Sequence, residues 1–169
     1  METLEYIKSQ ITYATSGWDG ILKDLTDDQC NWTPPGTCNS IAATVLHVYG
    51  AEDSLIQSKL KHQSPLWEIE GWADKIGVSA IPDPNNQWTE VKRNTLPITT
   101  LLAYGQRIHS ATNHYLSTLI PEELEREVEL LGSTRSVAET LSFLVIHLTR
   151  HSGEIAVLKG LQGLKGQMA

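Results

Sequence analysis

Two histidines in the C-terminal part of the chain have a spacing that suits a metal ion. His147 and His151, in the stretch HLTRHSGEI, are four residues apart. On a helix this spacing puts two side chains about 40° apart, so both imidazoles can reach one cation. The HExxH motif of metalloproteases has the same spacing, but here Leu148, Thr149 and Arg150 separate the histidines and supply no glutamate. The pair therefore predicts metal binding and disfavours the zinc-protease mechanism.

His47 is the third candidate ligand and lies within SIAATVLHVYGAEDS. Neutral imidazole is the commonest protein metal ligand, and helix bundles build sites from side chains on facing helices. His47 and His147 both lie at the flank of the apolar stripe of their predicted helices, where a side chain points along a helix interface. His47 alone would be interpreted as an interface histidine, but with His147 and His151 it completes a predicted three-histidine metal site.

Three neutral histidines would give such a site a particular chemistry. They bring no negative charge and leave at least one coordination position for water or substrate, as in catalytic zinc sites. A dication held there lowers the pKa of a bound water to about 7 or deprotonates a bound thiol. We expect zinc first, although three histidines also suit nickel, iron and manganese.

Two acidic residues are candidates for proton transfer or for orienting a ligand. Glu52 follows His47 by five residues on the apolar side of its predicted helix, where an unpaired carboxylate is costly to bury. It could orient a histidine, accept a proton or, as we favour, pair with a core tyrosine or the polar crossover. Glu154, three residues after His151, is the second candidate, and its plainer interpretation is a solvated surface acid.

Other histidines and tryptophans carry weaker patterns. His109 falls on the apolar face of its predicted helix without ligand spacing, which favours a core histidine. Trp67, Trp72 and Trp88 either roof a pocket over the metal or pack a loop onto the helices, and both interpretations stay open. The remaining histidines are expected at the surface: His62 and His114.

Four amphipathic segments of about 20 residues must position these side chains. Apolar residues recur at helical spacing in each of them. The predicted helices cover residues 3–25, 41–61, 98–119 and 136–158. Asn39 or Ser40 suits the N-cap of the second helix and Ser136 that of the last, while glycines from Gly160 onward end the last.

Breaker residues predict the connections. The stretch QCNWTPPGTCNS is expected to be a loop. Residues 64–97, with several prolines and the polar run PDPNNQ, predict an ordered crossover loop with one short helical piece near residues 67–75. The segment IPEELEREVELLGSTRS predicts a turn with a short acidic helix, and LKGLQGLKGQMA a frayed tail. These elements make an all-α four-helix bundle with one long crossover.

Composition limits the classes of function. The 169 residues carry 20 Asp plus Glu against 13 Lys plus Arg, so the net charge of −7 disfavours nucleic acid as a partner. The length and 40% hydrophobic content predict a single domain over residues 1–169. Because no run of about 18 apolar residues and no secretory leader is found, we expect a cytoplasmic protein without a membrane partner.

Three stretches of the chain resemble the DinB/YfiT-like family of metalloenzymes. They are NWTPPGTCNSIAATVLHVYGAEDS, PLWEIEGWADKIGV and SVAETLSFLVIHLTRHSGEIAVLKGLQGLKG, in this order, and the resemblance covers nearly the whole chain. The resemblance implies a bacterial up-down-down-up bundle, often a homodimer, with a divalent metal held by His47, His147 and His151. Characterised branches of the superfamily include bacillithiol and mycothiol S-transferases.

The expected function is therefore metal-dependent transfer of a low-molecular-weight thiol to an electrophilic small molecule. The choice of a thiol as the transferred group depends on the resemblance alone. One alternative is metal-assisted hydrolysis with Glu52 or Glu154 as proton shuttle. The other alternative is a bundle that binds a metal or a small molecule without catalysis.

Overall fold

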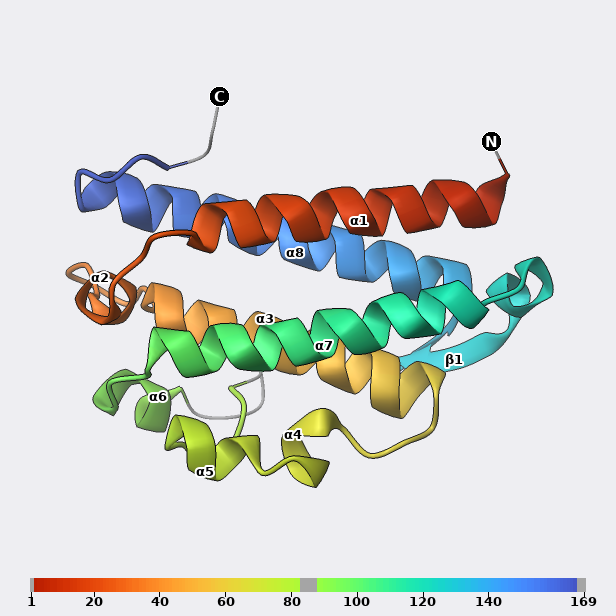
Figure 1. Ribbon diagram of the computed structural model, residues 1–169, viewed down its shortest axis with the longest axis horizontal. Helices are drawn as coiled ribbons and strands as arrows, with labels where there is room; N and C mark the ends of the chain where they lie inside the picture. Colours follow the sequence, from red (N-terminus) through yellow and green to blue (C-terminus); the bar gives the residue numbers. More distant parts are fainter. Residues whose placement is uncertain (1, 83–87, 167–169) are drawn as a thin grey trace.

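Four long helices form the body of the protein (Figure 1). The computed structural model describes residues 2–82 and 88–166. The long helices are α1 (Thr3–Leu22), α3 (Ile41–Asp53), α7 (Ile98–Thr118) and α8 (Val137–Leu161). Helices α1 and α8 run in one direction and α3 and α7 in the other (Figure 1). The predicted all-α up-down-down-up bundle is confirmed.

Helix starts agree with the predicted N-caps. The hydroxyl of Ser40 accepts a hydrogen bond from the backbone N–H of Ala43, which begins α3. Ser136 and Glu139 form a reciprocal capping box at the start of α8. Each cap satisfies backbone donors that the first helical turn leaves without a partner.

The first helix ends earlier than predicted. It stops at Leu22 instead of residue 25, and Asp24 takes a left-handed φ of 63°, which a helix cannot continue through. A short helix, α2 (Asp27–Asn31), follows, with a capping box between Thr26 and Gln29. The first three residues of the predicted loop QCNWTPPGTCNS are therefore helical, because this local cap overrides the loop signal of the residues after them.

The second predicted helix is continuous but changes its winding. It begins at Ile41 as predicted, and after α3 the chain continues as a π-helix, η1 (Ser54–Leu60). A π-helix needs hydrogen bonds from residue i to i+5, which a hydrophobic period does not predict. The end predicted at residue 61 lies within one residue of the observed end.

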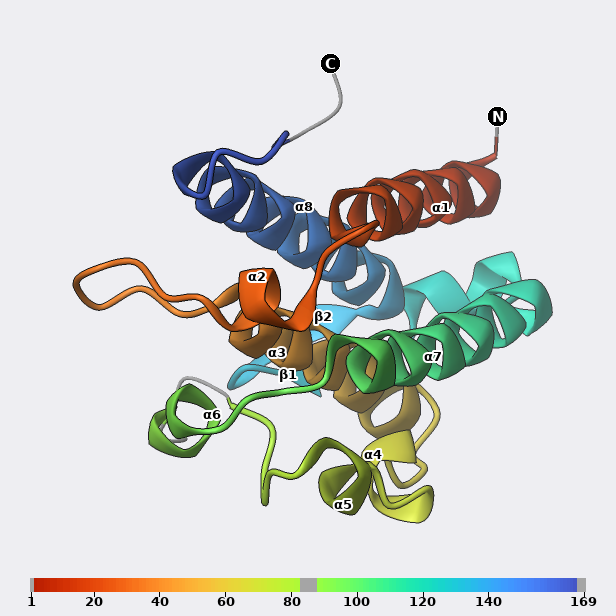
Figure 2. The ribbon, with the colours of Figure 1, turned by 60° about the vertical axis from the view of Figure 1, so that its left-hand side comes forward.

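The crossover from η1 to α7 packs below α3 and α7 (Figure 1). Its described residues form three short helices, α4 (Leu66–Ile69), α5 (Trp72–Ile76) and α6 (Thr89–Arg93). The single helical piece predicted near residues 67–75 is two helices, because Gly71 between them takes a φ of 66°. Most of the polar run PDPNNQ, residues 83–87, lies outside the described residues. Figure 2 shows the crossover as a separate layer on this side of the bundle.

A β-hairpin between α7 and α8 was not predicted. A 3₁₀ helix, η2 (Pro121–Glu125), occupies the place of the predicted acidic helix. The strands β1 (Glu127–Leu130) and β2 (Ser133–Ser136) then pair antiparallel. Only Val128 and Leu130 turn inward, so the alternation is too short to detect in the sequence.

The predicted frayed tail is wrong for its first part. Helix α8 continues to Leu161, and the Lys159 ammonium, 8% exposed, donates a hydrogen bond to the Ile21 carbonyl. The Gln162 amide donates to the Gln29 carbonyl. These contacts hold the end of α8 against α1 and α2, while residues 167–169 lie outside the described part of the chain.

The core fills the space between the four long helices. Its largest fully buried side chains are Trp18, Tyr49 and Tyr104. None of the described helices combines the length and the hydropathy that a membrane span requires.

Candidate metal centre

Helices α3 and α8 bring the three predicted ligands together. His47 comes from α3, and His147 and His151 come from successive turns of α8, which packs against α3. One nitrogen from each ring lies within 4.8 Å of the other two. The ring centroids are 5.1 Å apart for His47 and His147 and 4.5 Å apart for His147 and His151.

A backbone carbonyl fixes the orientation of His47. The Pro82 carbonyl oxygen lies 2.7 Å from Nδ1 of His47. Because a carbonyl only accepts, Nδ1 must carry the proton, which leaves a lone pair on Nε2. This Nε2 lies 3.2 Å from Nε2 of His147.

A carboxylate orients His151 in the same way. Oε2 of Glu154 lies 2.7 Å from Nδ1 of His151. The carboxylate accepts a hydrogen bond from the Nδ1–H of His151, which leaves Nε2 of His151 available as a ligand atom. Histidines that bind metals typically donate their other ring N–H to a carboxylate or a carbonyl, which are the two partners found here.

His147 is the most enclosed of the three ligands. It is 8% exposed, and the Phe143 ring stacks on it with centroids 5.6 Å apart. Burial, together with the charges of His151, His47 and Arg150, lowers the pKa of His147 to about 3. The imidazole is therefore neutral near pH 7, as a metal ligand must be.

The donor set fits a divalent cation. Two nitrogens bound to one tetrahedral zinc ion at about 2.0–2.1 Å lie about 3.3 Å apart. The 3.2 Å between the Nε2 atoms of His47 and His147 is close to this separation. Two of the three tautomers are fixed with Nε2 deprotonated, and one nitrogen of each ring lies within 4.8 Å of the other two, so the cluster offers imidazole nitrogens to a single ion.

Removing the carboxylate beside His151 should weaken metal binding. We expect Glu154→Gln to lower the affinity for zinc about 10- to 100-fold, because the amide orients the imidazole less firmly and lowers its basicity. Competition with a chromophoric chelator measures the affinity. Glu125→Gln, in η2 and outside this cluster, is the matched control and should leave the affinity unchanged. Equal affinities of the two variants would contradict the orienting role.

The three crossover tryptophans do not share one role. Trp88 lies against His47, with ring centroids 5.2 Å apart. Trp67 and Trp72 instead pack on the buried Tyr104 ring of α7. One tryptophan thus borders the histidine cluster, and the other two hold the crossover on the bundle.

Glu52 contacts a different set of residues. It is 1% exposed, and its Oε1 accepts a hydrogen bond of 2.7 Å from the Thr112 hydroxyl. Its Oε2 lies 3.5 Å from Nε2 of His109 on α7. Glu52 is thus paired, as the favoured interpretation had it, but its partners are Thr112 and His109 of α7 and not the predicted core tyrosine or crossover. Its role in proton transfer stays a prediction.

His109 makes the stability of the fold pH-dependent. Burial lowers its pKa, but the hydrogen bond and charge of Glu52 and the charge of Asp19 outweigh this and raise the pKa above 6.5. A histidine whose pKa is higher in the folded than in the unfolded state stabilises the fold when it is protonated. This stabilisation is complete below the unfolded-state pKa of about 6.5 and is lost as the pH rises through the folded-state pKa. The Tyr49 ring also lies against His109, with centroids 5.6 Å apart, and burial raises the pKa of Tyr49.

We therefore expect the advantage of wild type over His109→Gln in free energy of unfolding to shrink as the pH rises from 6 to 9. Urea denaturation at a series of pH values measures both proteins. His114→Gln, an exposed change on the same helix, should show no such trend. A difference that grows with pH would contradict the proposed pairing.

Two residues of the site were not predicted from the sequence. Pro82 contributes a carbonyl from the crossover, 35 residues from His47, and no side-chain pattern reports a backbone acceptor. Phe143 precedes His147 by four residues, and this helical spacing was a usable signal for a ring stacked on that ligand.

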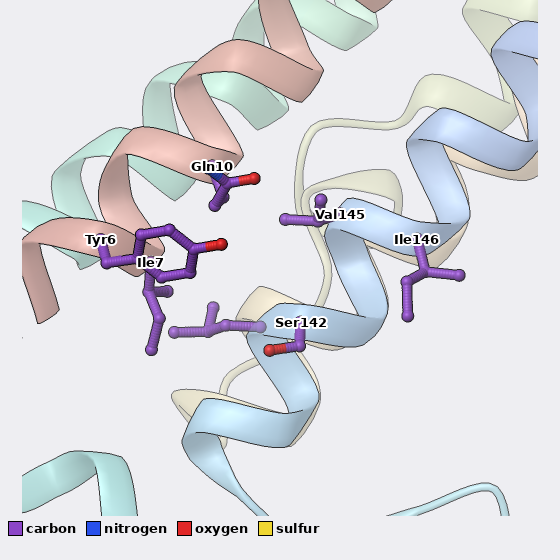
Figure 3. Close-up of a pocket in the computed structure, with 7 residues that line it drawn as sticks. Tyr6, Ile7, Gln10, Ser142, Val145 and Ile146 are labelled. Carbon is purple, nitrogen blue, oxygen red and sulfur yellow. The ribbon is translucent and has the colours of Figure 1, made fainter. Parts of the chain in front are cut away.

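A groove elsewhere on the surface does not include the histidines. It lies between α1 and α8, where Tyr6 and Gln10 face Ser142 and Val145 (Figure 3). Its volume of about 200 Å³ is below the range of about 300–1,000 Å³ that is usual for small-molecule pockets. The histidine cluster is therefore the better candidate for the functional site. The expected homodimer stays a prediction.

Comparisons with known proteins agree with this architecture. The sequence profile of the DinB superfamily matches residues 10–155. A conserved protein from Enterococcus faecalis superimposes with a TM-score of 0.78 at 19% identity, over 94% of this chain and 96% of that one. A DinB-like protein from Bacillus cereus superimposes with a TM-score of 0.66 at 18% identity, over 98% and 96% of the two chains. These structures share the fold, and no curated protein sequence matches the chain.

Proposed function

The chain belongs to the DinB superfamily, and from this membership we propose that it is a divalent-metal-dependent enzyme that transfers a low-molecular-weight thiol to an electrophilic small molecule. The observation that carries the proposal is the convergence of His47, His147 and His151 within 4.8 Å. The thiol is supported by the resemblance of the sequence motifs to the family.

The proposed metal ligands are these three histidines, with zinc as the expected ion. A bound dication would supply charge stabilisation for a thiolate near neutral pH. Imidazole ligands bring no negative charge, so they would leave the positive charge of the ion available to the substrate.

The residues around the ligands have separate proposed tasks. The Pro82 carbonyl and the Glu154 carboxylate hold the Nδ1 protons of His47 and His151, which keeps both Nε2 atoms directed inward. The rings of Phe143 and Trp88 lie against His147 and His47, where they exclude water from two sides of the cluster.

At the electrophilic carbon, the proposed reaction forms one bond and breaks one. The sulfur attacks the electrophilic carbon, and the leaving group departs with the electron pair of its bond to that carbon. The thiol proton passes to solvent. The contact of Glu154 supports a positioning role through His151 more directly than a role as proton acceptor.

Product analysis tests this proposal. The zinc-loaded protein is incubated with monochlorobimane and a panel of thiols that includes bacillithiol, mycothiol and cysteine, and products are identified by mass spectrometry. We expect a thioether product formed faster than without protein, and its loss in His151→Ala. A hydrolysis product in the absence of thiol would favour the hydrolase alternative. Metal binding without any turnover would favour a non-catalytic bundle.

A further inference from the structure

Gly50 lies three residues before the end of α3, inside the continuous helical segment that α3 forms with η1, where a glycine destabilises the helix. A glycine within a helix costs about 0.5–1 kcal/mol relative to alanine, so a buried one generally has a packing reason. Gly50 is buried and follows His47 by three residues, which places both on the same side of the helix.

The packing reason is a close approach of the crossover. A Cβ atom at Gly50 would overlap Cγ2 of Ile81 and would lie 2.6 Å from its Cδ1. The Cγ2 atom moves only by rotation about χ1, and Ile81 is a β-branched residue packed against the core, so few χ1 rotamers are open to it. A methyl group at Gly50 is therefore expected to force Ile81 out of its rotamer and to displace the Ile81 backbone or the helix.

Ile81 is joined directly to Pro82, whose carbonyl is the partner of His47. The hydrogen bond between the Pro82 oxygen and Nδ1 of His47 is 2.7 Å long, and a displacement of Ile81 would carry this oxygen with it. We infer that Gly50 is a positioning residue, whose lack of a side chain brings the Pro82 carbonyl onto His47 and so directs Nε2 of His47 to the metal. This inference rests on the proposed metal site.

The predicted effect follows from the loss of that acceptor. When Nδ1 of His47 has no fixed partner, the proton is free to move to Nε2 and the ring loses its orientation. When a metal-binding histidine loses the hydrogen-bond partner of its other ring nitrogen, the metal affinity typically falls about 10- to 100-fold. We expect Gly50→Ala to lower the zinc affinity by at least about 10-fold.

The experiment is a double-mutant cycle with zinc as the probe. Zinc affinity is measured by chelator competition for wild type, Gly50→Ala, Ile81→Ala and Gly50→Ala/Ile81→Ala. Truncation of Ile81 removes the overlap, so the double variant should regain an affinity within about twofold of Ile81→Ala. Gly105→Ala is the matched control, because its Cβ would overlap the Tyr49 ring away from the histidine cluster. It should lower thermal stability and leave the zinc affinity unchanged.

Nitrogen NMR of the metal-free proteins gives a second readout. In wild type His47 should be the Nδ1–H tautomer, and in Gly50→Ala it should become a mixture of both tautomers. If wild type binds no zinc, the proposed function fails and this tautomer shift alone decides the role of Gly50. An unchanged tautomer, or a zinc affinity of Gly50→Ala within twofold of wild type, would overturn the inference.

A folding failure of Gly50→Ala would still leave a decisive comparison. The double variant and Ile81→Ala both lack the overlapping atoms, so their zinc affinities should agree. A tenfold lower affinity of the double variant would show that Gly50 acts through something other than Ile81, and would also overturn the inference.

Discussion

Replacing His151 by alanine is expected to lower the affinity for zinc by more than about 100-fold. The variant keeps two of the three clustered imidazoles. Loss of a direct ligand should lower the zinc affinity by more than the 10- to 100-fold that follows when a ligand loses its hydrogen-bond partner. The His151 side chain is 15% exposed and lies at the edge of the cluster, so the bundle should remain folded without it.

Chelator competition, with circular dichroism to confirm folding, measures this effect. His114→Ala is the control, since His114 is exposed on α7 and outside the cluster. If His151→Ala and His114→Ala bind zinc equally well, His151 is not a ligand.

The second large effect concerns the attachment of the crossover to the bundle. Asp53 is 1% exposed at the end of α3, and its carboxylate accepts hydrogen bonds from the backbone N–H groups of Leu66 and Trp67 and from the Tyr104 hydroxyl. Burial raises the pKa of Asp53, and these three hydrogen bonds oppose that rise. We expect Asp53→Ala to lower the free energy of unfolding by at least about 3 kcal/mol, because each buried donor left without a partner costs about 1–3 kcal/mol.

Urea denaturation measures this prediction against a surface control. Asp74→Ala, an exposed change in α5, should alter the free energy of unfolding by no more than about 0.5 kcal/mol. A loss of similar size in both variants would mean that Asp53 does not anchor the crossover.

The long helices could be predicted because their signals are local. Apolar residues at helical spacing, with Ser40 and Ser136 as caps, locate α3 and α8 within one residue of their observed starts. The hairpin could not be predicted, because only Val128 and Leu130 of β1 turn inward and no longer alternation identifies the strands. The π-helix after Asp53 is defined by hydrogen bonds from residue i to i+5, which no hydrophobic periodicity encodes.

The same difference between local and long-range signals applies to the candidate site. The spacing of His147 and His151 on one helix is local, so the sequence suffices to place them together. The partner of His47 is a backbone carbonyl held by the fold of the crossover, and it became visible only in three dimensions. For Glu52 the sequence signal pointed to the wrong neighbours. Its proximity to His47 in the sequence suggested a role beside the metal ligands, but its side chain contacts Thr112 and His109 on α7.

The metal content of the purified protein tests the three-histidine site most directly. The protein is produced without a metal-binding tag, reconstituted in turn with zinc, nickel, iron(II) and manganese, desalted and measured by elemental analysis. We predict about one equivalent of a divalent transition metal per chain, with zinc retained most firmly. A chain that retains no metal after any of these reconstitutions would contradict the site formed by His47, His147 and His151.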